Sequence, residues 1–444
     1  MAGIAGIAAD NASEEVLEML CVMRHRGKTR LSVFENEGTT AGIIWNEPED
    51  DSVKEFLDAG EAGYYNSPGN YAVVRPDNGS FTMRRDELGS APLYYGSDND
   101  GNICFASEIK ALLPITSNII ELSPGHVYED DKLRSYFGIQ TGKKTEKSPD
   151  RIASELSGLL DKAVSDCLTS EDIGSFLSGG LDSSVICALA TRHLKKLKTF
   201  AAGLKGAPDL EHAREVARYL QTDHYELIIT PEKLTAILAE VIYHLESFDA
   251  LLVRSSLTNY LVARLASEHV AEVFSGEGGD ELFAGYGYLK SIPFEHLENE
   301  LVRITNTMHN TALQRVDRSA AAHSLTPHMI FTNPEVVKFA FTIPVEYKIH
   351  GTTEKWILRK AMEGRLPSGI LRRPKVKFWE GAGVKELIAV YAEKNISDND
   401  YRTERDLKNG IILGSKEELL YYRIFREHFG SDIDLSFMGR TITH

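Results

Sequence analysis

The sequence has few cysteines, and those present are scattered. Cys21, Cys104, Cys167 and Cys187 are the only four in 444 residues, and no two of them form a Cys-x-x-Cys pair. Isolated cysteines of this kind are typical of free thiols in a reducing compartment rather than of a disulfide framework.

Positive charge and long apolar runs are also scarce. The chain has 49 Lys and Arg residues against 65 Asp and Glu residues, a formal net charge of −16. Nucleic acids and anionic membranes would repel such a surface, so we expect neither as a partner. No apolar run approaches the ~18 residues that a membrane helix needs. The first eleven residues, MAGIAGIAADN, lack the Lys or Arg of a signal peptide. We therefore expect a soluble, cytoplasmic protein.

The length predicts two domains, because 444 residues exceed what one hydrophobic core usually supports. Short apolar runs broken by Gly, Pro, Asn and Asp predict strands and turns in residues 1–137. The polar segment GIQTGKKTEKSPD, residues 138–150, has no apolar periodicity and is the predicted linker. The second domain, residues 151–444, opens with apolar residues at helical spacing.

Strands and helices alternate in the first half of this second domain. The predicted strands are residues 173–177, 199–204, 225–229 and 270–274. Such alternation predicts a parallel sheet covered by helices on both faces, with ligands beyond the carboxyl ends of the strands. After residue 285 the pattern is mainly helical.

A glycine-rich segment, FLSGGLDSS at 176–184, follows the first of these strands and opens a helix. Its glycines let backbone N–H groups approach an anion, and its serines and the helix N-terminus favour phosphate. It is not a Walker loop, because the lysine of that motif is absent. Phosphate would repel Asp182 unless a cation lay between them, so Asp182 is a candidate Mg²⁺ ligand. The alternative is a tight turn with Asp182 as a helix cap.

SGGLDSS resembles the PP-loop of the ATP pyrophosphatases, which cleave ATP between the α and β phosphates and adenylate a substrate. A second segment, SGEGGDELFAGY at 275–286, resembles the second signature of the asparagine synthetase family. Residues 199–217, 241–256, 313–325, 354–378 and 415–429 look like the same family. The resemblance implies an α/β fold: an amidotransferase-like α+β domain, then a PP-loop synthetase domain with a parallel sheet and a helical C-terminal part.

The resemblance also implies roles for single residues. Asp182 and Asp280 would share Mg²⁺ bound to pyrophosphate. Glu277 matches the family's catalytic glutamate, which would deprotonate an incoming ammonium, whereas the β-lactam-forming relatives typically carry tyrosine there. Lys375 would neutralise the charge that develops as pyrophosphate leaves. The residues expected to line the ATP site are Leu177, Ser178, Gly179, Gly180, Asp182, Ser183, Ala202, Ser275 and Gly276.

The first domain resembles an N-terminal-nucleophile glutamine amidotransferase at residues 2–7, 23–27, 84–96 and 105–114. That domain needs a cysteine directly after the initiator Met, and this sequence has Ala2. The nearest cysteine, Cys21, lies in a predicted helix, and the family's Asn-Gly-Glu oxyanion motif is missing. We therefore expect a degenerate domain that does not hydrolyse glutamine and persists as a packing partner or as the dimerisation surface of a homodimer.

Two departures from the family leave the substrate open. Leu251 and Leu252 replace a pair of threonines before Arg254, and residues 328–333 replace an Arg-x-Pro-Phe-Leu-Asp motif. Arg254 itself remains and could pair with a carboxylate. The first expectation is an ammonia-dependent asparagine synthetase that uses aspartate, ammonia, ATP and Mg²⁺. The alternatives are an amide ligase for another carboxylate or amine, a regulatory homologue, and a PP-loop enzyme acting on tRNA, whose basic face and cysteine pair are absent.

Overall fold

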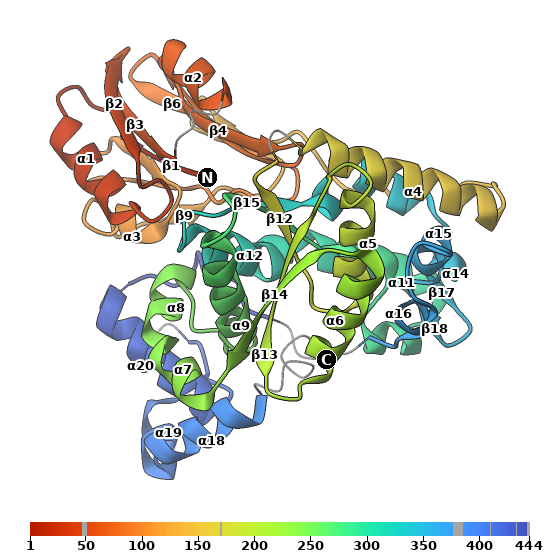
Figure 1. Ribbon diagram of the computed structural model, residues 1–444. Coiled ribbons are helices and arrows are strands. Elements are labelled where there is room, and N and C mark those ends of the chain that lie inside the picture. Colours follow the sequence, from red (N-terminus) through yellow and green to blue (C-terminus); the bar gives the residue numbers. More distant parts are fainter. Residues whose placement is uncertain (47–50, 169–170, 376–384, 409, 432, 442–444) are drawn as a thin grey trace.

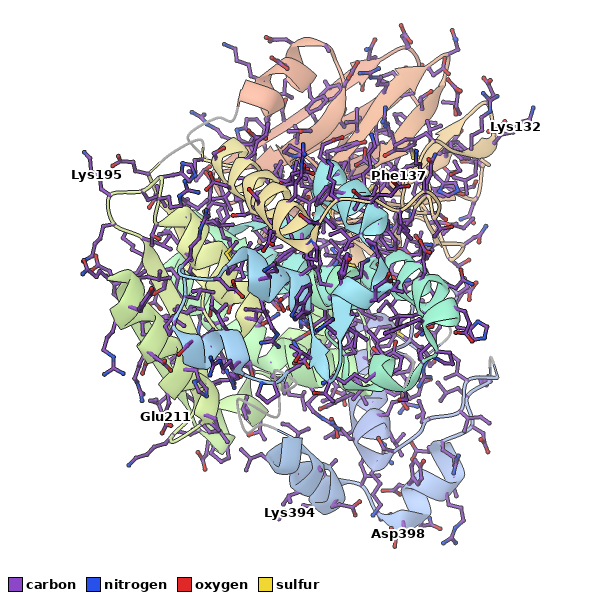
Figure 2. The ribbon with its side chains drawn as sticks, turned by 90° about the vertical axis from the view of Figure 1, so that its right-hand side faces the viewer. Lys132, Phe137, Lys195, Glu211, Lys394 and Asp398 are labelled. Atoms are coloured by element: carbon purple, nitrogen blue, oxygen red, sulfur yellow. The ribbon has the colours of Figure 1, made fainter. Side chains whose placement is uncertain are left out.

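The computed structural model describes residues 1–46, 51–168, 171–375, 385–408, 410–431 and 433–441. An antiparallel N-terminal part lies at the top of Figure 1, and a parallel sheet with its helices lies below it. Figure 2, the view turned by 90°, places Lys132 of the N-terminal part and Lys394 and Asp398 of the C-terminal helices at opposite ends of the molecule. Among the described residues, no helix combines the length and the apolar character needed to cross a bilayer.

Two antiparallel sheets face each other in the N-terminal part. The first contains β1 (Ala2–Ile7), β2 (Arg30–Asn36), β3 (Thr39–Trp45), β7 (Tyr94–Ser97), β8 (Ile103–Ala106) and β9 (Ile120–Glu121), in the order β2-β3-β1-β8-β7-β9. The second contains β4 (Ala62–Ser67), β5 (Asn70–Asp77), β6 (Ser80–Arg85), β10 (His126–Glu129) and β11 (Lys132–Ser135), in the order β11-β10-β6-β5-β4. The strands predicted in this region are therefore present. Three helices accompany the sheets: α1 (Ser13–Val22), α2 (Asp51–Asp58) and α3 (Ile109–Leu112).

The two sheets enclose an apolar core because alternate strand residues point inward. Ile4, Ile43 and Phe105 from the first sheet and Tyr64 and Met83 from the second are fully or almost fully buried in it. Within the first sheet, Gly6 of β1 pairs with Phe105 of β8, and a Cβ on Gly6 would lie 2.5 Å from the Phe105 ring. A larger residue at this point of β1 would displace that buried ring.

The second sheet system is parallel throughout, as the alternating pattern predicts. It contains β12 (Ile173–Phe176), β13 (Lys198–Leu204), β14 (Asp223–Ile229), β15 (Glu272–Ser275) and β16 (Thr326–Met329), in the order β14-β13-β12-β15-β16. The strands β12 to β15 coincide with the predicted ones to within two residues. The sequence pattern does not indicate β16, because this four-residue strand contains Pro327, which a strand tolerates at a sheet edge.

Helices cover both faces of this sheet, with α5 (Leu181–Ala190) and α6 (Pro208–Leu220) on one side and α9 (Ala250–Ser267) on the other (Figure 1). Residues 136–148, which connect β11 to α4 (Pro149–Asp166), contain no helix or strand. The other helices up to residue 321 are α4 (Pro149–Asp166), α7 (Pro231–Ala236), α8 (Leu238–Leu245), α10 (Gly279–Phe283), η1 (Gly287–Ser291), α11 (Phe294–Asn306), η2 (Met308–Asn310) and α12 (Ala312–Ala321). The predicted helical C-terminal part follows as η3 (Ile330–Thr332), α13 (Pro334–Thr342), α14 (Val345–Lys348), α15 (Trp356–Ala361), α16 (Ser368–Arg372), α18 (Lys385–Asn395), α19 (Asp398–Glu404) and α20 (Lys416–Phe429), with a hairpin of β17 (Ile349–His350) and β18 (Thr353–Glu354).

A buried ion-pair network joins the two parts. Arg26, after α1, reaches Glu108 of its own part at 2.8 Å and Asp317 of α12 at 2.8 Å. Arg318 pairs with Glu108 at 3.0 Å and with Glu246 at 2.9 Å. Burial alone would raise the pKa of Glu108, but its neighbours His25, Lys110 and Arg318 outweigh burial and hold that pKa well below its ordinary value. The network is therefore charged, and it fixes the N-terminal part on α12.

Candidate active site

A pocket of about 840 Å³ opens at the carboxyl ends of the parallel strands. Both glycine-rich segments border it because β12 and β15 are neighbours and each ends in one of these loops. The predicted residues that line it are Leu177, Ser178, Gly180, Asp182, Ser183, Ala202, Arg254, Ser275, Gly276, Glu277, Asp280 and Lys375. The structure thus brings together all the predicted site residues except Gly179.

Gly179 lies in the turn between β12 and α5, whose backbone conformation requires a glycine. Its φ of +72° lies in the left-handed region, and a Cβ would come within 2.6 Å of the Ala213 backbone nitrogen. Hydroxyl groups hold the rest of the loop: the Ser178 and Ser183 oxygens lie 3.1 Å apart, and Ser184 donates to the Gly180 carbonyl at 2.6 Å. The first residues of α5, Leu181, Asp182 and Ser183, line the pocket, and the N-terminus of a helix is suited to binding phosphate.

The second loop presses directly on the first. A Cβ on Gly276 would lie 2.7 Å from the Ser183 backbone nitrogen, and one on Gly279 would lie 2.6 Å from an Asp182 carboxylate oxygen. Only glycine at these two positions lets β15 and α10 approach the PP-loop so closely. This contact sets the separation of Asp182 from Asp280.

Lys355, which was not among the residues predicted for the site, lies between these two aspartates. Its Nζ is 2.5 Å from Asp182 and 2.5 Å from Asp280, and Lys375 Nζ reaches the other oxygen of Asp280 at 2.5 Å. Burial opposes ionisation of Asp280, but the two ammonium groups outweigh it and lower its pKa. For Asp182 burial is the largest influence and raises the pKa. The only sequence signal for Lys355 was its place in the family-like segment 354–378, of which residues 376–378 lie outside the described residues.

The two aspartates fit a magnesium ion. One Asp182 oxygen is buried and has no hydrogen-bond partner among the described residues. Carboxylates are the hard oxygen ligands that Mg²⁺ prefers, and Mg²⁺ is usually held by one or two of them together with substrate phosphates.

Glu277 also lines the pocket and forms an ion pair with Arg315 of α12. The two side chains meet at 2.6 Å, and Arg315 also donates to Ser255 of α9 at 3.0 Å. Nearby, Tyr286 donates to Glu281 at 2.5 Å, and burial, followed by the charge of Asp280, raises the pKa of Glu281 to about 7. Arg315 therefore fixes Glu277, which sequence reasoning about Glu277 alone did not foresee.

Arg254 lines the pocket, but its guanidinium is engaged with Glu417 of α20. Arg254 Nε donates to one Glu417 oxygen at 3.0 Å and Nη2 donates to the other, while Tyr421 donates to the same carboxylate at 2.8 Å. The six residues 328–333, by contrast, do not line the pocket. His328 is buried in β16 and contacts Glu272 at 2.5 Å.

At the family's nucleophile position, Ala2 is buried and its carbonyl accepts a hydrogen bond from Arg26 at 3.1 Å. The Met1 amino group donates to Thr326 of β16. Cys21 lies in α1, as predicted, and is exposed.

The parallel sheet, the paired glycine loops and the carboxylates beside them define an α/β protein of the adenine nucleotide hydrolase-like class, preceded by an antiparallel amidotransferase-like part. A family model described as asparagine synthase matches residues 155–301 and 295–440, and one described as a glutamine amidotransferase domain matches residues 52–166. The chain belongs to the asparagine synthase family.

Two relatives illustrate the similarity. The glutamine-hydrolyzing asparagine synthetase of Zea mays is 34% identical over 389 residues, which cover 82% of this chain and 66% of that protein. The glutamine-hydrolyzing asparagine synthetase B of Escherichia coli (strain K12) is 32% identical over 384 residues, which cover 81% of this chain and 69% of that protein. The chain thus spans about two thirds of the length of these relatives. The match to a solved NMN synthetase from Francisella tularensis is 14% identical, covers 66% of this chain and 99% of that one, and has a TM-score of 0.31.

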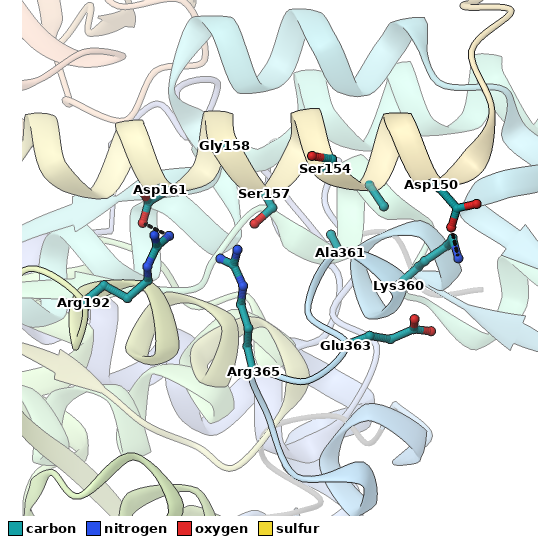
Figure 3. A pocket seen from close by; sticks show the side chains of 11 residues that line it. Asp150, Ser154, Ser157, Gly158, Asp161, Arg192, Lys360, Ala361, Glu363 and Arg365 are labelled. Carbon is teal, nitrogen blue, oxygen red and sulfur yellow. Dashed lines mark ion pairs between the residues drawn. The ribbon is translucent and has the colours of Figure 1, made fainter.

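A second hollow, of about 420 Å³, lies apart from this site between α4, the end of α5 and the residues after α15 (Figure 3). Two ion pairs span it, Arg192 with Asp161 at 2.9 Å and Lys360 with Asp150 at 2.6 Å. It shares no lining residue with the larger pocket.

Proposed function

We propose that the protein makes an amide from a carboxylate, ATP and free ammonia through an acyl-adenylate, as an asparagine synthetase-like ligase. The observation that carries this proposal is the meeting of both glycine loops, Asp182, Asp280, Glu277 and Lys375 in one pocket. Membership of the asparagine synthase family supports it. The same family supports aspartate as the first carboxylate to test.

In the first half-reaction, a substrate carboxylate oxygen attacks the α-phosphorus of ATP and pyrophosphate leaves. Ser178, Ser183 and the N–H groups that open α5 would bind the phosphates. Asp182 and Asp280 would hold Mg²⁺, and the ion would screen the phosphate charge from both carboxylates. Lys355 and Lys375 are the cations placed to stabilise the departing pyrophosphate.

In the second half-reaction, ammonia attacks the acyl carbon and AMP leaves. Glu277 would take the proton of the incoming ammonium, and Arg315 and Ser255 orient that carboxylate through the contacts described above. The amide nitrogen therefore enters from the α9–α12 side of the pocket.

Ammonia, rather than glutamine, is proposed because the amidotransferase-like part has Ala2 where a nucleophilic thiol is needed. We propose that this part, residues 1–137, is degenerate and serves for packing. It is joined through residues 138–150 to the synthetase domain, residues 151–444. A homodimer and a cytoplasmic location are part of the same proposal.

Another carboxylate is the main alternative, and one observation favours it. Leu251 lines the pocket where the family has threonine, so the wall beside Arg254 is less polar than that of a typical family member. An acid with an apolar portion would fit this wall better than aspartate would.

The decisive experiment measures carboxylate-dependent exchange of pyrophosphate into ATP, and amide formation with ammonium or glutamine, over a panel of acids. We expect exchange with at least one acid, product with ammonium salts, and none with glutamine. Product rates should rise with pH as free ammonia increases. Equal rates with glutamine would refute the proposed nitrogen source, and the absence of exchange with every acid would refute the proposed chemistry.

The two half-reactions can be separated at Glu277. Glu277→Gln keeps the size of the side chain but cannot accept the proton, so amide formation should fall by ~10²-fold or more while pyrophosphate exchange persists. Lys375→Ala should instead impair exchange itself. Parallel loss of both activities in Glu277→Gln would assign this residue to binding.

A further inference from the structure

The last described segment, residues 433–441, returns from the end of α20 to the rim of the active-site pocket. We call it the C-terminal tail. Leu435 and Phe437 anchor it in the core, and the Phe437 ring lies 6.5 Å from that of Tyr94 in the N-terminal part. Beyond this anchor Gly439, Arg440 and Thr441 line the pocket.

Hydrogen bonds fix the tail to the N-terminus of α9. The Thr441 backbone nitrogen and hydroxyl donate to the Asp249 carboxylate at 2.9 and 2.8 Å. Asp249 also caps α9 by accepting from the Leu252 nitrogen at 2.8 Å. The tail is therefore attached to the turn that presents Leu251, Leu252 and Arg254 to the pocket.

Close packing leaves the tail little freedom at Gly439. A Cβ there would lie 2.3 Å from the side chain of Asn310, which also lines the pocket. The backbone therefore passes directly against the α12 side of the site, and Arg440 is held at the rim.

Arg440 differs from the other arginines that line the pocket. Arg254, Arg315, Arg359 and Arg373 have side chains no more than 13% exposed, each paired with a carboxylate. Arg303 pairs through two nitrogens with Glu300, on its own helix. The Arg440 side chain is 33% exposed and donates one described hydrogen bond, to Glu418, which is 4% exposed.

A guanidinium has five N–H donors, so the contact with Glu418 leaves Arg440 able to bind a second carboxylate side by side. Glu418 is itself held by the Gly414 nitrogen, so the pair is fixed in place. Arg440 thus supplies a positioned cation next to Thr441, which is bonded at the start of α9, whereas Lys355 and Lys375 are paired with Asp182 and Asp280.

We propose that the C-terminal tail completes the substrate end of the pocket, and that Arg440 binds the carboxylate of the acid that is not adenylated. A dicarboxylic acid or an amino dicarboxylate, such as the aspartate already proposed, supplies this second carboxylate. This inference rests on the proposed function, because it assigns one of two substrate carboxylates to Arg440.

The test compares Arg440→Met with Arg426→Met in pyrophosphate exchange. Arg426 is an exposed arginine of α20 outside the pocket, so its replacement controls for loss of a surface charge. With aspartate and with other dicarboxylates, Arg440→Met should raise the KM for the acid about ten- to hundredfold, the range for a hydrogen-bonded charge. The KM for ATP should stay unchanged.

Arg440→Lys keeps the charge beside Glu418 and should recover part of the affinity, which separates substrate binding from a mere structural role. An unchanged KM for the acid in Arg440→Met, or equal increases for the acid and for ATP, would overturn the inference while leaving the proposed function intact. A wild-type protein without exchange on any acid would overturn both.

Discussion

Single residues set the electrostatics of the site, and Lys355 contributes most. It contacts both aspartates, is 2% exposed, and has a φ of +54°, a left-handed conformation that lysine rarely adopts. Such backbone strain usually costs on the order of 1–3 kcal/mol and persists where surrounding structure enforces it. Here the two ion pairs provide that enforcement.

Removing the Lys355 charge should therefore destabilise the protein and make it responsive to magnesium. Lys355→Met leaves Asp182 and Asp280 facing each other without the shared cation, and we expect a loss on the order of 3 kcal/mol in the free energy of unfolding. Added Mg²⁺ should raise the Tm of this variant more than that of the wild type, because the ion replaces the lost charge.

Lys360→Met is the matched control, since Lys360 lies on α15 and pairs with the exposed Asp150. Its Tm should not respond to Mg²⁺ differently from that of the wild type. Equal magnesium responses in all three proteins would show that Asp182 and Asp280 do not hold the ion.

At the scale of elements, the sequence predicted the strands correctly where apolar runs alternate with helical segments. The strands predicted at 173–177, 199–204, 225–229 and 270–274 appear as β12 to β15, because continuous apolar runs between helices identify buried parallel strands. The short strand β16 lacked such a run. For the site, the motifs located both loops, but Lys355, Arg315 and Arg440 come from distant segments that only the folded chain brings together.

The edge pair of β15 and β16 should make stability depend on pH. Burial lowers the pKa of His328, but the influence of the nearby Cys167 and then of Glu272 outweighs burial and raises the pKa to about 9. A histidine with a raised folded-state pKa stabilises fully below its unfolded value of about 6.5, and this contribution is lost as the pH rises through 9.

The free energy of unfolding of the wild type should therefore fall, relative to that of His328→Gln, by on the order of 2–3 kcal/mol between about pH 6.5 and pH 9.5. Urea titrations across this range measure the difference. Identical pH profiles for the two proteins would mean that His328 is neutral in the folded state.

At the scale of the whole molecule, the Arg26 network couples the two parts. Asp317→Ala removes the carboxylate that pairs with Arg26 at 2.8 Å and leaves a fully buried cation with one partner fewer. We expect a loss of about 3–5 kcal/mol and separate unfolding transitions for the N-terminal and synthetase parts, visible by calorimetry.

Glu61→Gln provides the comparison, because it removes the exposed pair with Arg75 inside the N-terminal part. It should cost less than about 1 kcal/mol and leave the transitions together. A single, unshifted transition in Asp317→Ala would mean that apolar packing alone holds the two parts in place.

Lys355 also affects the structure of the site when no nucleotide is bound. Two neighbouring carboxylates in a buried site repel each other, and this repulsion raises the pKa of one of them unless a cation lies nearby. Here the fold supplies an internal counterion, so both glycine loops can remain in contact without metal or nucleotide. A chelator should accordingly leave the Tm of the wild-type protein unaltered, and the site should be preorganised for ATP rather than assembled by it.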